Sequence, residues 1–198
     1  MAFWGSKYNG STFKDPKRKF RFLVQITNLS AATTEDSTGT GTLASSDMWF
    51  AKTCTRPSFT IASTEHSYLN HKFYYPGTLT WNDVTITFAD PQDPNAGAAF
   101  SAFINGTNGA GYDVPSNASV LNTMSKAKAV SAIGDVIVKT LDADGKEIEK
   151  WTLYNAFITD LKYGDHAYGD DELIEMSVTF KYDWAKLNVT DGGATYFD

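Results

Sequence analysis

An alternating pattern between residues 174 and 184 constrains the fold of this chain more than any other feature. Over these eleven residues, from Ile174 to Trp184, an apolar side chain occupies every second position and a polar one each position between. A two-residue period is typical of a β-strand with one buried face and one solvated face. At about 3.3 Å per residue the strand would span about 36 Å, which is long for a globular protein. The sequence therefore predicts a sheet that covers a core on one side.

Further strands are expected along most of the chain. Segments with strand-like alternation or β-rich composition lie at 19–27, 48–54, 83–88, 133–141 and 147–163. Asp144-Gly145 is typical of a tight turn between the last two, and a mixed apolar register near Asn155 predicts a bend or bulge. The segment 55–82 is rich in aromatic and β-branched residues but alternates poorly. We expect it to form an extended hairpin or loop that another surface must cover.

Two segments favour helix. Asp93-Pro94 is expected to begin the main helix, because Asp is a favoured N-cap and Pro fits the first helical position. Asn105-Gly106 is expected to end it. A weaker helical pattern runs from 116 to about 130. The stretch 30–46 is rich in Thr, Ser and Gly and is predicted to be a surface loop.

The composition excludes several classes of protein. With 198 residues, 42% hydrophobic and 20% charged, the chain fits a single globular domain. The net charge of −6 and the lack of a basic stripe argue against a nucleic-acid-binding surface, and the basic cluster 14–21 is interpreted as a solvated or inter-subunit patch. No run approaches the roughly 20 apolar residues of a membrane span. A single cysteine, Cys54, and an N-terminus without a long apolar stretch favour synthesis in a reducing cytoplasm.

Patterns typical of catalysis are lacking. The glycine runs match neither a phosphate loop nor a dinucleotide fingerprint, and no G-x-S-x-G motif occurs. His66 and His71 are expected on opposite faces of an extended segment. The acidic loop 164–172 (GDHAYGDDE) has ligands for a hard cation such as calcium, but it lacks EF-hand spacing and equally fits a polar hairpin tip. We predict no enzyme, no metal site and no cofactor.

The order of these features resembles that of the tail-tube proteins of contractile-tailed bacteriophages. The resemblance begins with KDPKRKFRFLVQI at the first strand and continues with TLTWNDVTITF before the helix. Its most specific part is C-terminal, where a W-x-L-x-N-A-F-I-T strand leads through a short acidic loop to I-x-M-x-V-T-F-x-Y-D. It covers most of the chain, about residues 16–187.

The resemblance implies a mainly β fold, in which two packed antiparallel sheets form a sandwich closing towards a barrel, flanked by one main helix. It divides the chain into an N-terminal arm (1–17), a tail-tube-like β domain (18–187, with 30–46 inserted) and a C-terminal tail (188–198). It also implies a structural subunit of the virion. Six copies form a ring, the rings stack into a tube, and one sheet of each copy helps to line a channel for DNA. Implied partners are further copies of the chain, the tail sheath, and the baseplate and tail-terminator proteins, with DNA passing through unbound.

Two candidate surfaces follow. The polar face of the final strand is the candidate channel lining: Glu175, Ser177, Thr179, Lys181 and Asp183. An acidic wall suits this role, because repelled phosphates slide past it, although mild acidity is also ordinary for a globular protein. The aromatic-rich segment holds the candidate ring-to-ring contacts: Phe59, Ile61, Tyr68, Phe73, Tyr74 and Tyr75.

Other hypotheses remain open from the sequence. The chain also fits a tube subunit of a bacterial contractile injection or secretion system, or of a non-contractile tail. A different class is a carbohydrate-binding β-sandwich that uses exposed Trp and Tyr side chains. A hydrolase on a jelly-roll fold is more distant.

Overall fold

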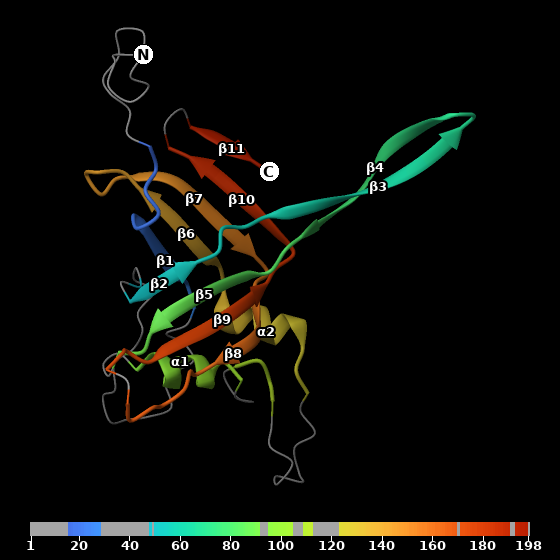
Figure 1. Ribbon diagram of the computed structural model, residues 1–198. Coiled ribbons are helices and arrows are strands. Elements are labelled where there is room, and N and C mark those ends of the chain that lie inside the picture. The colour runs from blue at the N-terminus through green and yellow to red at the C-terminus, as the bar shows by residue number, and fades with distance from the viewer. Residues whose placement is uncertain are drawn as a thin grey trace, which may run out of the picture.

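The protein folds into two facing sheets and one projecting ribbon (Figure 1). The computed structural model describes residues 16–28, 48, 50–91, 95–104, 109–112, 123–169, 171–190 and 193–197. All strand pairings in these ranges are antiparallel. The predicted mainly β, sandwich-like fold is confirmed.

The larger sheet has five strands in the order β1-β6-β7-β10-β11. They are β1 (Phe22–Ile26), β6 (Val136–Leu141), β7 (Glu147–Tyr154), β10 (Trp184–Val189) and β11 (Ala194–Tyr196). The predicted turn at Asp144-Gly145 joins β6 to β7, with Gly145 at a φ of 76°. The segment 188–198, expected as a tail, supplies the end of β10 and all of β11.

The smaller sheet has four strands in the order β2-β5-β9-β8. They are β2 (Ala51–Cys54), β5 (Val84–Ala89), β9 (Glu175–Lys181) and β8 (Phe157–Lys162). Beyond this sheet, β3 (Phe59–Tyr68) and β4 (His71–Trp81) pair with each other as a two-stranded hairpin. The hairpin continues from the β2–β5 pair and projects away from the sheet, because β3 follows β2 and β4 leads into β5 (Figure 1).

The core lies between the two sheets. Alternate side chains of β5 and β9 point into it and are almost fully buried: Val84, Ile86, Phe88, Met176, Val178 and Phe180. The five-stranded sheet supplies the opposite layer: Val24, Ile26, Val136, Val138, Leu153 and Ala185. Burying a large apolar side chain contributes about 1.5–3 kcal/mol, so this interior layer is the main source of stability.

Two short helices cover the core in the described part of the chain, where the sequence favoured a main helix and a weaker second one. In α1 (Ala96–Ala102), Phe100 packs on Phe88 with ring centroids 5.4 Å apart. The predicted start of this helix was wrong: the N-cap is Asn95, whose side chain accepts a hydrogen bond from the N–H of Ala98 at 2.8 Å. Asn and Asp cap equally well, and the sequence offers both within three residues. Residues 92–94, including the predicted cap, lie outside the described part of the chain.

The second helix also begins later than predicted. It is α2 (Lys126–Ile133), it is capped by Ser125, and it packs against β8. Gly134, at a φ of 69°, ends it, and a Cβ there would lie 2.3 Å from the Thr27 hydroxyl oxygen. Most of the predicted range 116–130 precedes α2, and residues 113–122 lie outside the described residues.

The chain crosses from one sheet to the other at two adjacent corners. The first is the predicted bend at Asn155, which has a φ of 54° and separates β7 from β8. The second is Asp183, between β9 and β10. The Asn155 side-chain amide donates to the Asp183 carboxylate at 2.8 Å, and the Asp183 N–H donates to the Tyr154 carbonyl at 3.1 Å.

The second corner shows that the predicted single strand from Ile174 to Trp184 was wrong. The strand ends at Lys181, and Trp184 begins β10 in the other sheet. The apolar alternation continues across the corner for a separate reason. Tyr182 is buried at the corner, whereas Trp184 is turned outwards and stacks on Tyr154 at 5.4 Å.

Candidate assembly surfaces

The hairpin is a long exposed element. Every residue of β3 and all of β4 except Trp81 are exposed. All six predicted contact residues lie on it, and each is between 42% and 66% exposed. Of the two predicted forms, hairpin or loop, the β3–β4 pairing shows the hairpin, and its apolar side chains are exposed in the described part of the chain. Patches of this kind on a folded protein mark sites of interaction.

The pairing of β3 with β4 divides the outer half of the hairpin into two faces. One face, here called the aromatic face, carries three facing pairs: Tyr68 with His71, His66 with Phe73, and Thr64 with Tyr75. The opposite face is more polar and holds Tyr74 and a Lys72–Glu65 ion pair at 2.9 Å. The predicted contact residues are thus split, with Tyr68, Phe73 and Tyr75 on one face and Tyr74 on the other.

The two histidines lie on the same face, contrary to the expectation from strand alternation. The chain reverses at Leu69, which has a φ of 54°, so His71 belongs to the returning strand. Facing residues of paired strands share a side of the ribbon. His71 also meets Phe73 edge to face, with ring centroids 4.8 Å apart.

A cluster of rings fixes the inner end of the hairpin to the body. This root cluster consists of Phe59, Trp81, Trp151, Tyr182 and Phe197. Phe197 lies 5.7 Å from Phe59 and 5.4 Å from Trp81, and Trp81 lies 5.9 Å from Tyr182. Trp151 stacks on Phe197 at 6.3 Å. Phe59, a predicted contact residue, therefore serves the attachment of the hairpin as well as its surface.

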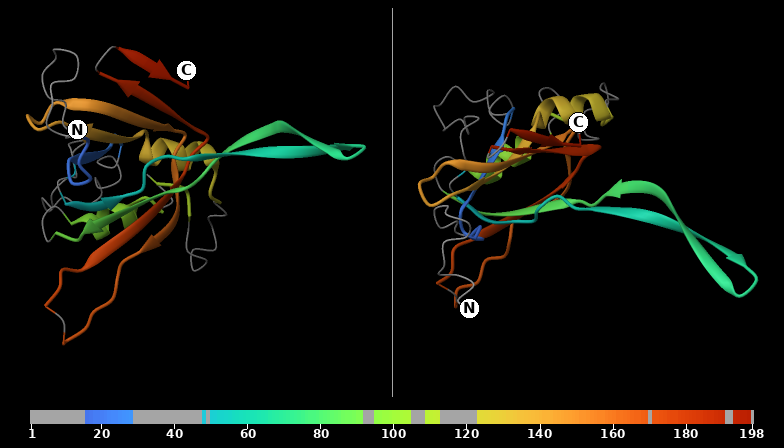
Figure 2. Two further views of the ribbon diagram at one scale, coloured as in Figure 1. Left: turned by 45° about the horizontal axis from the view of Figure 1, so that its top comes forward. Right: turned by 90° about the horizontal axis from the view of Figure 1, so that it is seen from above.

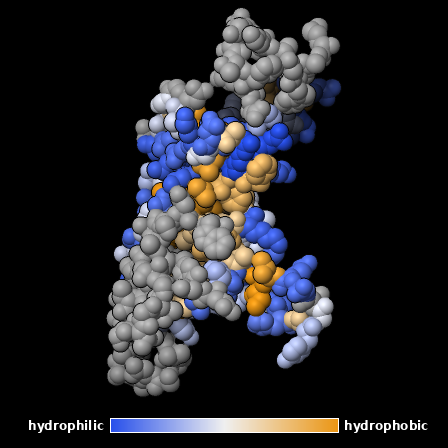
Figure 3. All heavy atoms as spheres, turned by 90° about the vertical axis from the view of Figure 1, so that its left-hand side faces the viewer, coloured by the Kyte–Doolittle hydropathy of each residue, from blue (hydrophilic) through white to orange (hydrophobic). Residues whose placement is uncertain are grey.

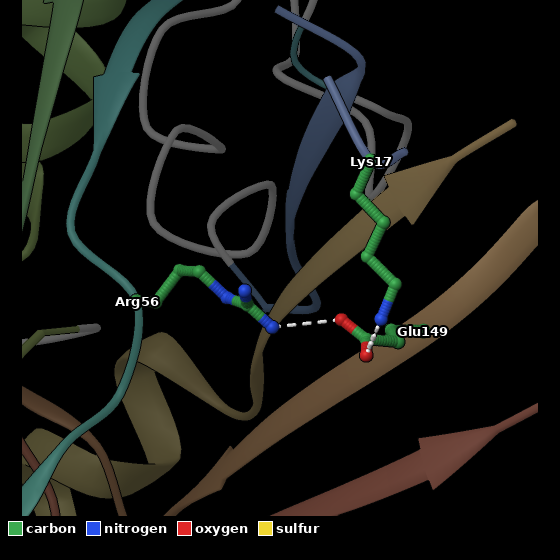
Figure 4. Close-up of polar contacts among 3 residues, drawn as sticks. All are labelled: Lys17, Arg56 and Glu149. Atoms are coloured by element: carbon green, nitrogen blue, oxygen red, sulfur yellow. Dashed lines mark hydrogen bonds and ion pairs between the residues drawn. The ribbon is translucent and has the colours of Figure 1, made fainter. Parts of the chain in front are cut away.

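An ionic contact on the same strand as Trp151 holds two further segments (Figure 4). Glu149 of β7 is only 7% exposed, and its carboxylate accepts from Arg56 at 2.7 Å and from Lys17. Arg56 belongs to the link between β2 and β3, and Lys17 precedes β1. A buried carboxylate needs such partners, because an unpaired charge in the interior is costly. The root of the hairpin and the segment before β1 are therefore tied to one residue.

The outer face of the four-stranded sheet is lined by small hydroxyl side chains. This hydroxyl face consists of Thr53, Thr85, Thr87, Ser177 and Thr179. Its middle is joined by a contact of 3.1 Å between the hydroxyls of Thr85 and Thr179. Four of the predicted lining residues, namely Glu175, Ser177, Thr179 and Lys181, alternate along β9 on this side of the sheet.

The charges around the hydroxyl face are paired. Three ion pairs connect strands or neighbouring residues at its margins: Lys52 with Glu175, Lys181 with Asp83, and Lys162 with Asp160. The hydrogen bond to Glu175 raises the pKa of Lys52. The surface is therefore closer to neutral than the net charge of the chain suggests.

The fifth predicted lining residue lies elsewhere. Asp183 is at the corner after β9, and its carboxylate accepts from Lys126 at 2.6 Å and from Asn155 at 2.8 Å. The hydrogen bond from Lys126, followed by that from Asn155, lowers the pKa of Asp183. Its contacts join α2 to the two corners.

The four-stranded sheet ends on both sides in an open strand. Neither β2 nor β8 has a second neighbour in the ranges given above. Because neighbouring strands alternate in direction, β2 and β8 run in opposite directions. Unpaired edges of this kind offer N–H and C=O groups to another chain.

The described residues contain little that suggests a catalytic or metal-binding site. No three His, Cys, Asp or Glu side chains among them are grouped so as to hold a metal ion. Burial raises the pKa of the Cys54 thiol to about 12, which leaves it protonated and unreactive at neutral pH. In the same part of the chain, the helices lack the length and apolar character needed to cross a bilayer.

Several solved structures of contractile devices share this fold. A chain in the structure of the anti-feeding prophage cap, which terminates the tube, matches with a TM-score of 0.62 and 16% identity, covering 96% of this chain and 100% of that one. A chain of the PVC extracellular contractile injection system, from its extended sheath–tube complex, matches with 0.60 and 14%, covering 88% and 93%. A chain in the structure of the sheath/tube terminator of the same system matches with a TM-score of 0.60 and 15% identity, covering 90% of this chain and 100% of that one.

The chain therefore has the fold found in these tube, cap and terminator structures. The predicted resemblance to tail-tube proteins is confirmed at the level of the fold. No protein-family model matches the chain, and no curated protein matches it either.

Proposed function

We propose that this chain is the structural subunit of a tube built from stacked hexameric rings, in a phage tail or a related contractile particle. The observation that carries the proposal is the hairpin, which is held at its root and uncovered along its outer half. An element with these properties is suited to contact another copy. The fold of tube and cap components supports the same role.

Ring closure would use the open edges of the four-stranded sheet. The sheet has an even number of alternating strands, so rotation about a ring axis brings β8 of one copy beside β2 of the next in antiparallel orientation. Closing the ring satisfies both edges and leaves none for aggregation. The β2 and β8 edges are therefore the contacts within a ring.

The hydroxyl face would then line the channel. Short, uncharged side chains and balanced ion pairs neither attract nor strongly repel phosphates. DNA contacts that release few counterions are weak, so a DNA chain could slide along such a wall. In this proposal the channel wall is neutral, whereas the sequence suggested an acidic wall that repels phosphates. Asp183 is then not part of the lining. The sheath, baseplate and terminator proteins are the remaining partners in this proposal.

Electron microscopy of the purified protein tests the proposal. Negative staining is expected to show rings with six-fold symmetry and tubes made from them. A protein that stays monomeric at high concentration would refute it.

A second candidate is a subunit that terminates a tube. It is favoured by the match to the anti-feeding prophage cap, which covers 96% of this chain at a TM-score of 0.62. A terminator would form rings that do not stack on one another, whereas a tube subunit would form long stacks. The same micrographs distinguish the two.

A further inference from the structure

The loop between β8 and β9 projects from the end of the four-stranded sheet opposite to the hairpin. In the β5–β9 pair, Val84 faces Phe180 at one end and Ala89 faces Glu175 at the other. The hairpin leaves from the Val84 end, and the loop 163–174 leaves from the Ala89 end (Figure 2). One copy of the chain therefore carries one projection at each end of the same sheet.

The base of this loop is held in place. The Tyr163 and Ser101 hydroxyls are 2.7 Å apart, which ties the end of β8 to α1. The N–H of Asp90 donates to the carbonyl of Ile174 at 3.0 Å. Gly164 has a φ of 77°, and a Cβ on it would lie 2.4 Å from the Glu175 carbonyl oxygen. These contacts fix the direction in which the loop leaves the sheet.

The described residues of the loop combine exposed apolar side chains with carboxylates. Tyr168 is fully exposed and Leu173 is 79% exposed. Asp165, Asp171 and Glu172 lie in the same segment. Figure 3, which views the side of the molecule away from the hairpin, shows hydrophobic side chains among hydrophilic ones on that side. The loop therefore offers both apolar contact area and hydrogen-bond acceptors.

We propose that this loop receives the hairpin of the next copy along the tube. The inference rests on the proposed tube function. An open stack repeats a head-to-tail contact, in which one end of a copy meets the opposite end of the next. The hairpin and the loop occupy those two ends, and each exposes apolar side chains that the described residues of its own copy leave uncovered.

The chemistry of the two surfaces is complementary. The aromatic face offers ring surface together with the O–H groups of Tyr68 and Tyr75 and the N–H groups of two imidazoles. The loop offers Tyr168 and Leu173 for apolar packing and carboxylates that accept from those donors. Carboxylates would repel DNA, and a neighbour within the ring would meet the sheet edges and not its ends. A second copy stacked on the first is therefore the partner that fits.

The first test is a loop variant, Tyr168→Ser with Leu173→Ser, in the full chain. It is expected to form rings but to lose tubes in electron micrographs. Tyr112→Ser with Met124→Ser removes two exposed apolar side chains outside both surfaces and is the matched control, which should retain tubes. If the first variant fails to form rings, Asp171→Lys with Glu172→Lys provides a second loop variant with the same expected loss of tubes.

The second test uses complementation. A hairpin variant, Phe73→Ser with Tyr75→Ser, keeps an intact loop, and the loop variant keeps an intact hairpin. Each alone is expected to remain as single rings, and an equimolar mixture should form two-ring stacks, measured by sedimentation velocity. Loop variants that polymerise like the unmodified protein, or a mixture that stays as single rings, would overturn the loop assignment. Unmodified protein that forms no rings would instead overturn the tube function itself.

Discussion

At the scale of single residues, adjacent positions on the hairpin serve different faces. Phe73 lies on the aromatic face and Tyr74 on the polar one. We expect Phe73→Ser to reduce tube formation strongly, because it removes apolar area that the proposed contact between rings would bury. Tyr74→Ser is the matched control and is expected to have a smaller effect. Pelleting of polymers measures both, and an equal loss in the two variants would contradict the assignment of faces.

The Glu149 contact makes a prediction about stability. Lys17→Ala combined with Arg56→Ala leaves a buried carboxylate without its two cationic partners. We expect a loss of about 1–3 kcal/mol in the free energy of unfolding, measured by urea denaturation. Lys72→Ala removes one partner of an exposed pair and should change stability by less than about 1 kcal/mol. A double variant as stable as this control would show that the contact is unimportant.

Tyr182 predicts a loss of stability at high pH. Burial, together with the nearby Asp83 carboxylate, raises the pKa of Tyr182 from 10.0 to about 12. The folded state holds the Tyr182 proton more tightly than the unfolded state. The resulting contribution to the free energy of unfolding is complete below pH 10 and is lost as the pH rises to about 12. Cys54 acts in the same direction, so we expect Tyr182→Phe to remove only part of the slope. Urea midpoints measured between pH 9 and 12 test this, and an unchanged slope in the variant would contradict it.

Residue roles were predictable only where local sequence decides them. The bend at Asn155 was visible as a break in the apolar register. The corner at Asp183 was hidden, because Tyr182 and Trp184 continue the alternation for unrelated reasons. The ion pair between Glu149 and Arg56 joins residues 93 positions apart, and nothing in the local pattern indicates it.

At the scale of elements, the root cluster determines how the hairpin is held. We expect Phe197→Ala to speed amide hydrogen exchange at the inner end of the hairpin, near Phe59 and Trp81, because both rings lose a contact. Exchange at the outer end should be unchanged. Tyr196→Ala, on the neighbouring exposed residue, serves as the control. Equal exchange in the Phe197 variant and the unmodified protein would show that the cluster does not hold the hairpin.

The elements themselves were largely predictable, and their ends were not. The hairpin, the β6–β7 turn and most strands follow from composition and alternation. The start of α1 was misplaced because Asp93 and Asn95 are equally good caps in the sequence. The two faces of the hairpin depend on the register that its turn sets, and a one-residue slip of β4 against β3 would move the side chains of β4 to the opposite face.

At the scale of the whole molecule, the neutral hydroxyl face makes a prediction about DNA. Ser177→Lys with Thr179→Lys would give the proposed lining a positive charge. Tubes of this variant are expected to retain double-stranded DNA that resists nuclease, because a basic wall releases counterions when DNA binds. Unmodified tubes should retain little. DNA that binds the variant but is fully digested would indicate that these residues face outwards.

The arrangement of the strands in the two sheets could not be predicted from the sequence pattern. Alternation shows that a strand has a buried face, but it does not say which strand lies beside it. The order β2-β5-β9-β8 and its two open edges follow from contacts between segments far apart in the chain. The same holds for the opposite directions of the hairpin and the β8–β9 loop.

The root cluster also has a consequence for synthesis. Phe197 comes 116 residues after Trp81, so a growing chain completes the hairpin long before it can fix it in place. Chains emerge from the ribosome with the N-terminal side first. A hairpin without Phe197 lacks one of the rings that hold its direction, and unfinished chains are then poor partners for finished ones. In the proposed tube, polymerisation would therefore begin only after translation has passed the last ring of the cluster.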